Sequence, residues 1–110
     1  MKTAAPGASG PFQLVASANG RFAARGPLTF ATARQAREEG LRCLTGAPGR
    51  ELEVDCGGIT AADSAGLAVV LDWLGAAKRA GCGLRYTQLP EGLMALGRIS
   101  EVGELLERGV

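Results

Sequence analysis

An α/β fold that begins with an antiparallel hairpin is the fold that this sequence predicts, on two observations. From Glu51 onward, strand patterns and helix patterns alternate along the chain, which is typical of parallel strands joined by crossover helices. Before that point, the dipeptide Asn19-Gly20 separates two short apolar runs, and Asn-Gly favours a tight hairpin turn. We therefore expect a mixed, mostly parallel sheet in one domain over residues 11–110.

The first half of the chain predicts the hairpin and one helix. The two apolar runs of the hairpin are Phe12 to Ser17 and Arg21 to Arg25. Gly26-Pro27 then predicts a break after the second strand. Small and apolar residues at helical spacing predict a helix from about Thr29 to Leu44, and Gly40 weakens it.

The second half predicts alternating strands and helices. Glu51 to Cys56 alternates apolar and charged residues, which predicts a strand, and Gly57-Gly58 ends it. Apolar residues at helical spacing predict a long helix from Ser64 to about Ala80, stopped by Gly81. Three more elements are predicted after it: a strand from Leu84 to Gln88, a helix from Pro90 to about Arg98, and a short terminal helix with Val102, Leu105 and Leu106.

Composition excludes several classes of function. The 12 basic and 11 acidic residues are scattered along the chain and form no stripe, so we expect no nucleic-acid partner. The sequence has no histidine and its three cysteines lie far apart, so we expect no metal site and no cofactor. Cys43, Cys56 and Cys82 are interpreted as small buried hydrophobes in a reducing compartment.

Two segments bear on export and on membranes. Residues 1–10 contain one lysine and no apolar core, so we interpret them as a flexible leader and not as a signal peptide. The longest apolar run, Gly66 to Leu71, is interrupted by Asp72, far short of the roughly 20 residues that cross a bilayer. We expect no direct insertion into a membrane.

The most informative stretch is Asp63-Ser64-Ala65-Gly66-Leu67, because it places a hydroxyl at the predicted start of a helix. Asp and Ser cap helices, and their replacement by Ala costs about 0.5–2 kcal/mol. The same position exposes a hydroxyl to a kinase or a partner loop. The helix dipole would favour a phosphate on Ser64, whereas Asp63 would repel it. Capping and recognition are compatible, and the residues alone leave both open.

Catalysis has little support in the sequence. A serine hydrolase needs a base beside its serine, but histidine is absent and the two lysines, Lys2 and Lys78, lie in the leader and far along the helix. Neither common glycine-rich phosphate motif occurs. Asp55 and Asp63 are interpreted as a solvated strand face and a helix start, and not as a catalytic pair. We expect no catalytic residue.

The long predicted helix carries a second apolar stripe, roughly opposite its first. This stripe comprises Ala65, Val69, Trp73, Ala76 and Ala80. A helix that is apolar on both sides is either sandwiched inside its own domain or meets another protein. Trp73 is the only tryptophan, and tryptophan is enriched in interface hot spots. Both the core interpretation and the partner interpretation of Trp73 fit the sequence.

These residues resemble a known family. The segment Glu51-Leu52-Glu53-Val54-Asp55, followed by Ile59 to Leu67, resembles the strand, loop and Asp-[Ser/Thr]-x-Gly-Leu motif of STAS domains, the family named for sulphate transporters and anti-sigma factor antagonists. Leu89 to Leu93 and Leu96 to Val102 are similar to the small, MlaB-like STAS subunit of the Mla-type phospholipid ABC transporter. The resemblance implies a STAS fold, with the sheet packed against about four helices.

The resemblance also implies a function. It implies a non-catalytic subunit that binds the cytoplasmic ATPase subunit of the transporter, and through it the permease. That subunit supports assembly or activity in phospholipid transport and helps maintain outer-membrane lipid asymmetry. Its expected location is cytoplasmic, peripheral to the inner membrane through its transporter partners. The sequence decides neither for nor against a homo-oligomer.

The predicted docking surface starts from Ser64, which matches the Ser/Thr position of the family motif. That position is phosphorylated in the anti-sigma factor antagonists and contacts the partner in the transporter subunit. The alternative function is therefore an anti-sigma factor antagonist regulated by phosphorylation of Ser64. We expect the loop from Ile59 to Gly66 to dock on the ATPase, flanked by the exposed side of the following helix. The predicted partner-binding residues are Asp63, Ser64, Ala65, Gly66, Asp72 and Trp73.

Overall fold

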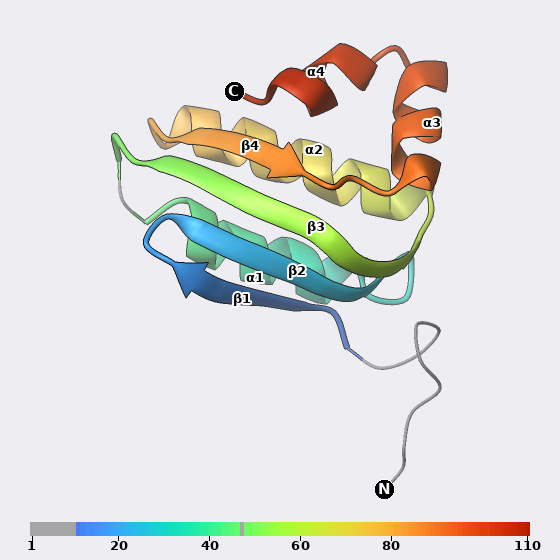
Figure 1. The fold of residues 1–110 in the computed structure, drawn as a ribbon, viewed down its shortest axis with the longest axis horizontal. Coiled ribbons are helices and arrows are strands. Elements are labelled where there is room, and N and C mark those ends of the chain that lie inside the picture. Colours follow the sequence, from blue (N-terminus) through green and yellow to red (C-terminus); the bar gives the residue numbers. More distant parts are fainter. Residues whose placement is uncertain (1–10, 47) are drawn as a thin grey trace, which may run out of the picture.

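The strands form one four-stranded sheet in the computed structural model, which describes residues 11–46 and 48–110 (Figure 1). The strands are β1 (Gln13–Ala18), β2 (Arg21–Leu28), β3 (Glu51–Ala62) and β4 (Gly83–Thr87). Their order in the sheet is β1-β2-β3-β4, with β1 antiparallel to β2 and the other pairs parallel. This arrangement confirms the predicted mixed sheet with its opening hairpin. The predicted leader, residues 1–10, lies outside the described residues.

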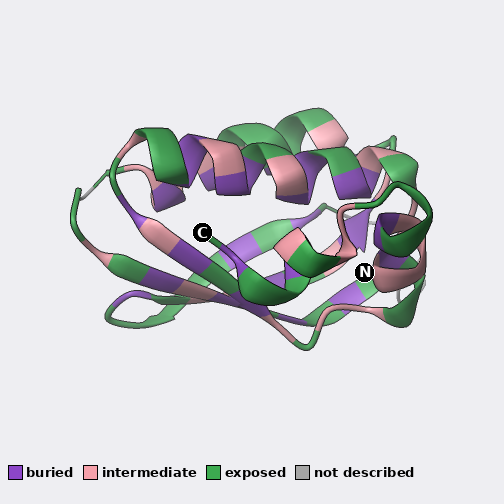
Figure 2. Cartoon of the chain, turned by 90° about the horizontal axis from the view of Figure 1, so that it is seen from above, coloured by how far each residue is buried: buried purple, intermediate pink, exposed green. Residues whose placement is uncertain are grey.

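The described part of the chain has four helices, of which the first two connect strands and the last two follow β4. They are α1 (Ala33–Leu44), α2 (Ser64–Arg79), α3 (Glu91–Ile99) and α4 (Gly103–Arg108). The two long helices, α1 and α2, lie side by side over the sheet (Figure 2), and α4 lies along the β4 edge (Figure 1). The other face of the sheet carries exposed charged side chains, among them Glu51, Asp55 and Arg85. No helix of the described residues is long and apolar enough to cross a bilayer.

Both central strands extend further than the sequence predicts. The extra residues are Gly26–Leu28 of β2 and Gly57–Ala62 of β3, and Gly26–Leu28 pairs in parallel with Ile59–Ala62. The pairing of β2 with β1 ends at Arg25, so Pro27 needs no N–H on that side. The predicted break at Gly26-Pro27 and the predicted loop after Gly57-Gly58 are therefore wrong. A proline is tolerated at position 27 because β2 has no strand partner on the β1 side beyond Arg25.

Helix α1 begins at Ala33, about four residues later than predicted, because residues 29–32 form a tight turn. The N–H of Thr32 donates to the carbonyl of Thr29 at 3.0 Å, which closes the turn. The hydroxyl of Thr32 accepts the N–H of Thr29 at 3.0 Å and donates to the carbonyl of Pro27 at 2.8 Å. Its side chain thus stabilises the turn and makes no cap for α1. Phe30 lies at the corner of this turn.

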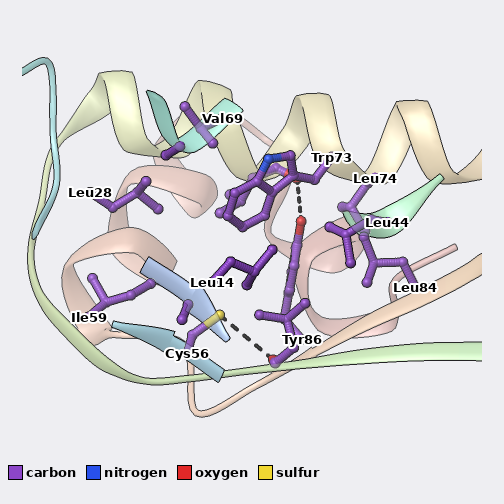
Figure 3. Close-up of a cluster of buried hydrophobic side chains, with 14 of the residues drawn as sticks. Leu14, Leu28, Leu44, Cys56, Ile59, Val69, Trp73, Leu74, Leu84 and Tyr86 are labelled. Atoms are coloured by element: carbon purple, nitrogen blue, oxygen red, sulfur yellow. Dashed lines mark hydrogen bonds between the residues drawn. The ribbon is translucent and has the colours of Figure 1, made fainter. Parts of the chain in front are cut away.

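Helix α2 is sandwiched inside the domain, which answers the question raised by its two apolar stripes. One stripe is buried through Leu67, Val70 and Leu74, and the other through Val69 and Trp73. Figure 3 shows Val69, Trp73 and Leu74 of α2 converging with side chains of the strands. Burial on both sides follows from the packing of α2 against the sheet, α1 and α3.

Trp73 lies at the centre of the core and is completely buried (Figure 3). Its ring centroid is 5.8 Å from that of Phe12 and 6.5 Å from that of Tyr86, in tilted geometries that favour aromatic pairs. The Tyr86 hydroxyl donates to the carbonyl of Val70 at 2.6 Å, which links β4 to α2. Gly40 of α1 admits the indole, because a Cβ there would collide with the indole ring. The glycine that weakens α1 locally is required by this packing.

Candidate functional site

The start of α2 is fixed by one carboxylate that accepts two backbone hydrogen bonds. Asp63 is the N-cap residue in extended conformation, and its Oδ1 accepts the N–H of Gly66 at 3.1 Å. Its Oδ2 accepts the N–H of Phe30 at 3.0 Å, from the turn that follows β2. The carboxylate of Asp63 therefore joins two segments that are 33 residues apart in sequence.

These bonds also determine the charge of Asp63. The N–H of Phe30 is the main cause that lowers the pKa of this carboxyl, and the N–H groups at the start of α2 act in the same direction. Partial burial opposes them. Asp63 is therefore ionised at neutral pH, and both of its oxygens are engaged within the domain.

Gly66 lets α2 begin close to the end of β2. A Cβ on Gly66 would collide with the backbone carbonyl of Leu28. Gly66 and the following Leu67 are both buried. Gly66 was predicted to contact a partner directly, but it is buried and has no surface to offer. Its role is to let α2 pack closely against β2.

Ser64 has the opposite environment. It occupies the first position of α2, its side chain is exposed, and its hydroxyl makes no hydrogen bond to any residue of the described chain. The sequence left open whether Ser64 or Asp63 caps the helix, and the structure assigns the cap to Asp63. The hydroxyl of Ser64 is thus free for an external group.

Two other predicted contact residues lie near the surface of α2. Ala65 is half-buried, and Asp72 is exposed and pairs with Arg37 of α1 at 3.0 Å. Ser64, Ala68 and Asp72 are all exposed and follow one another at intervals of four residues, so they form one row along α2. The structure therefore keeps Ser64 and Asp72 on the same exposed row.

The prediction that Trp73 flanks the docking surface is wrong. Its exposed fraction is 0%, and its side chain packs in the core described above. Nine residues separate it from Ser64, which is about two and a half turns of an α-helix, so the two side chains lie on opposite sides of α2. The core interpretation of Trp73 is the correct one.

Phe30 is the residue at this site that the sequence analysis missed. Its side chain is 85% exposed, although its backbone is bonded to Asp63. The sequence placed it inside a predicted helix, where an aromatic residue is expected to face the core. The usable signal was Pro27 three residues earlier, which favours a turn over the start of a helix.

Comparison with known proteins identifies the family. A family model described as "Mlab, STAS domain" matches residues 15–107, which is most of the chain. The chain belongs to the STAS family. A comparison with curated proteins gives no significant match.

Among solved structures, the STAS chain is similar to murine Solute Carrier 26 family member A9 (Slc26a9), an anion transporter in the inward-facing state. The TM-score is 0.58 at 18% sequence identity, and the match covers 82% of this chain and 15% of the transporter chain. The present sequence thus spans only a small part of that protein. At this identity the likeness shows the fold alone, and it confirms the predicted STAS fold.

The STAS motif of this chain now has a physical explanation, residue by residue. Asp63 caps α2, Gly66 allows the contact with β2, and Leu67 fills the core. Ala65 is half-buried, and Ser64 is the one residue of the five that is exposed. The fold accounts for Asp63, Gly66 and Leu67, and it leaves Ser64 exposed without an internal partner.

Three further observations concern the chemistry of the described residues. Among residues 11–46 and 48–110, no group of three or more His, Cys, Asp or Glu side chains could hold a metal ion. Burial, aided by the charge of Asp55, raises the pKa of Cys56 to about 12, so this thiol stays protonated and is a poor nucleophile at neutral pH. A hollow of about 410 Å³ lies at the opposite end of α2 from Ser64, where Lys78 and Arg108 line it.

Proposed function

We propose that this chain is the non-catalytic STAS subunit of an Mla-type ABC transporter. In this proposal it binds the cytoplasmic ATPase subunit through the surface around Ser64 and, through that subunit, is attached to the permease. It supports the assembly or activity of a complex that transports phospholipid and maintains outer-membrane lipid asymmetry. It would then be a cytoplasmic protein held at the inner membrane by its partners.

One observation carries the proposal: Ser64 is the only exposed residue of the motif, and its hydroxyl has no partner among the described residues. It stands at a helix start that Asp63 and Gly66 hold rigidly, so a partner meets a preformed surface and little ordering entropy is lost on binding. The family match to an Mlab-type STAS domain supports a transporter partner over other partners.

The work of the complex belongs to the partners in this proposal. The described residues offer the surface of Ser64 no histidine base and no metal site, so ATP hydrolysis would be carried out by the ATPase subunit. The exposed row Ser64, Ala68 and Asp72 presents small side chains beside Ser64, so a partner helix or loop can approach α2 closely.

The test is an affinity measurement with the ABC ATPase subunit encoded nearest to this gene. Replacement Ser64→Lys puts a long cation at a helix start, where the dipole is unfavourable, and into the proposed contact. We expect the Kd for the ATPase to rise at least about tenfold, which is about 1.4 kcal/mol. Calorimetry or surface plasmon resonance measures this change.

A matched control is Ser17→Lys, which makes the same replacement at an exposed serine of β1, far from α2. It should leave the Kd unchanged. Absence of binding by the unaltered chain, or equal binding by Ser64→Lys, would overturn the proposal.

The second candidate function, an anti-sigma factor antagonist, is favoured by the same exposed and unbonded hydroxyl. A phosphate on Ser64 would meet the N–H groups and positive dipole end of α2, although Asp63 would repel it. Incubation with ATP and the anti-sigma kinase encoded nearest to this gene, followed by intact-mass measurement, separates the two functions. One phosphate per chain, lost in Ser64→Ala, would favour the antagonist.

A further inference from the structure

Phe30 is the large apolar side chain that is most exposed in the described residues. The side chain of Phe30 is 85% exposed and that of Ile99 is 80% exposed. The other exposed large apolar residues, Val15 and Val110, are 37% and 36% exposed. Aromatic residues are concentrated in the central parts of protein interfaces, where they bury large areas of apolar surface. The exposed ring of Phe30 is therefore a candidate contact for a partner.

The backbone of Phe30 is fixed by its neighbours on both sides. Thr29 and Thr32 close the turn through two hydrogen bonds of 3.0 Å each. The N–H of Phe30 itself donates to Oδ2 of Asp63 at 3.0 Å. The ring therefore projects from a rigid turn, and only its side-chain rotation would be lost when a partner covers it.

The exposed residues nearest to Phe30 along the chain and across its hydrogen bond are small or polar. Ala31 follows Phe30, and Ser64 follows its hydrogen-bond partner Asp63. The carboxylate of Asp63 is satisfied by two N–H groups of the domain, and the one exposed cation close in sequence is Arg34, in the first turn of α1. Interface cores are depleted in charged residues, so the ring itself suits an apolar pocket of the partner.

Phe30 is also continuous with the proposed ATPase contact. Asp63 bonds the Phe30 backbone and caps the helix whose first residue is Ser64, so the two exposed side chains are held by one carboxylate. A partner that covers Ser64 therefore meets the ring of Phe30 at the same contact. This continuity is the reason to assign the ring to the same partner and not to a separate one.

We propose that Phe30 is the apolar anchor of the docking surface, and that its ring enters an uncharged pocket of the ATPase subunit. Asp63 is a positioning residue in this contact, because it holds the turn that carries the ring. This inference rests on the proposed function. It adds a specific residue, remote from Ser64 in sequence, on which affinity depends.

The test is the affinity of Phe30→Ala for the same ATPase subunit. We expect the Kd to rise about 30-fold, which equals about 2 kcal/mol and is the size typical of a hot-spot aromatic residue. Phe30→Leu should recover part of the affinity, because it retains apolar volume. Since Phe30 is exposed, the midpoint of thermal unfolding of Phe30→Ala should stay close to that of the unaltered chain.

A matched control is Ile99→Ala, which removes an equally exposed apolar side chain from the far end of α3. It should not change the Kd. If Phe30→Ala binds as the unaltered chain does while Ser64→Lys does not, this inference fails and the proposed function stands. If the unaltered chain does not bind the ATPase, both fail.

Self-association through Phe30 would contradict the assignment of its ring to the ATPase contact. Light scattering of the isolated chain should show a monomer whose mass is the same for Phe30→Ala. A dimer that dissociates on this replacement would place Phe30 between two copies of the chain and overturn the assignment to the ATPase.

Discussion

Ser64 and Trp73 lie on one helix and were both predicted to contact a partner, yet their environments are opposite. Ser64 is exposed and unbonded at the start of α2, whereas Trp73 is sealed between α1 and the sheet. The difference comes from the helix periodicity and from Gly40, which opens α1 to the indole. Tryptophan is the residue type enriched at interfaces, yet position within the fold buries Trp73 and leaves Ser64 exposed.

The largest expected change in the free energy of unfolding is at Trp73, the buried residue of this pair. Trp73→Ala should lower the free energy of unfolding by about 3–5 kcal/mol, because it removes the aromatic centre of the core and leaves a cavity. Ser64→Ala, on the exposed side, should change it by less than about 0.5 kcal/mol. Urea unfolding of the two variants measures both values, and similar losses would contradict the assignment.

A double-mutant cycle sharpens the role of Gly40. Gly40→Ala should destabilise the chain by about 1–3 kcal/mol, despite the better helix propensity of alanine, because its Cβ collides with the indole. The loss should shrink in the background Trp73→Phe, where the smaller ring leaves room. Additive effects of the two changes would show that Gly40 and Trp73 do not depend on each other.

A loss of stability of similar size is expected at Gly66, where the start of α2 meets the core. Gly66→Ala should cost about 1–3 kcal/mol, since its Cβ would collide with the carbonyl of Leu28 and push α2 away from β2. Gly75→Ala, on the same helix, contacts only the flexible end of Arg79 and should be neutral or stabilising by up to about 1 kcal/mol. Thermal unfolding compares the stabilities of the two variants. Equal losses would contradict the requirement for close packing of α2 against β2 at Gly66.

The smallest effect concerns the cap, and it depends on pH. Asp63→Ala should cost about 0.5–2 kcal/mol at neutral pH. The folded pKa of Asp63 is lowered, so its stabilisation is complete above its unfolded pKa of about 3.9 and is lost as the pH falls through the lower folded value. The difference between the two chains should therefore shrink only below about pH 4.

The control for this cap is Asp72→Ala, which breaks an exposed ion pair with Arg37. Such pairs contribute about 0–1 kcal/mol, so its cost should be the lower of the two. A cost of Asp63→Ala that stays constant down to pH 2 would show that the ionised carboxylate is not the stabilising form.

The order and type of the elements could be predicted from the sequence, because local periodicity reports them. The alternation of apolar and charged residues predicted β3 as a strand, and the apolar stripes predicted α2 as a helix. The C-terminal ends of β2 and β3 could not be predicted, because pairing between distant residues sets them. Gly26-Pro27 reads locally as a break, and only its pairing with the end of β3 makes it a strand.

The candidate site was predictable in part for the same reason. The motif predicted the cap and the exposed hydroxyl, since both are local features of a helix start. Phe30 was not predicted, because its exposure follows from the turn that Thr32 closes and from a bond to Asp63, 33 residues away. The burial of Trp73 needed knowledge that α1 packs against α2 at Gly40.

The two edges of the sheet differ in a way that limits how copies of the chain can join. At β4, Leu84 exchanges both backbone hydrogen bonds with Val110, and α4 lies alongside. β1 has no strand beyond it in the described residues, and its six residues include neither charge nor proline. Strand addition is therefore open only at β1, so two copies joined there would leave no free edge for a third and could not extend into a fibre.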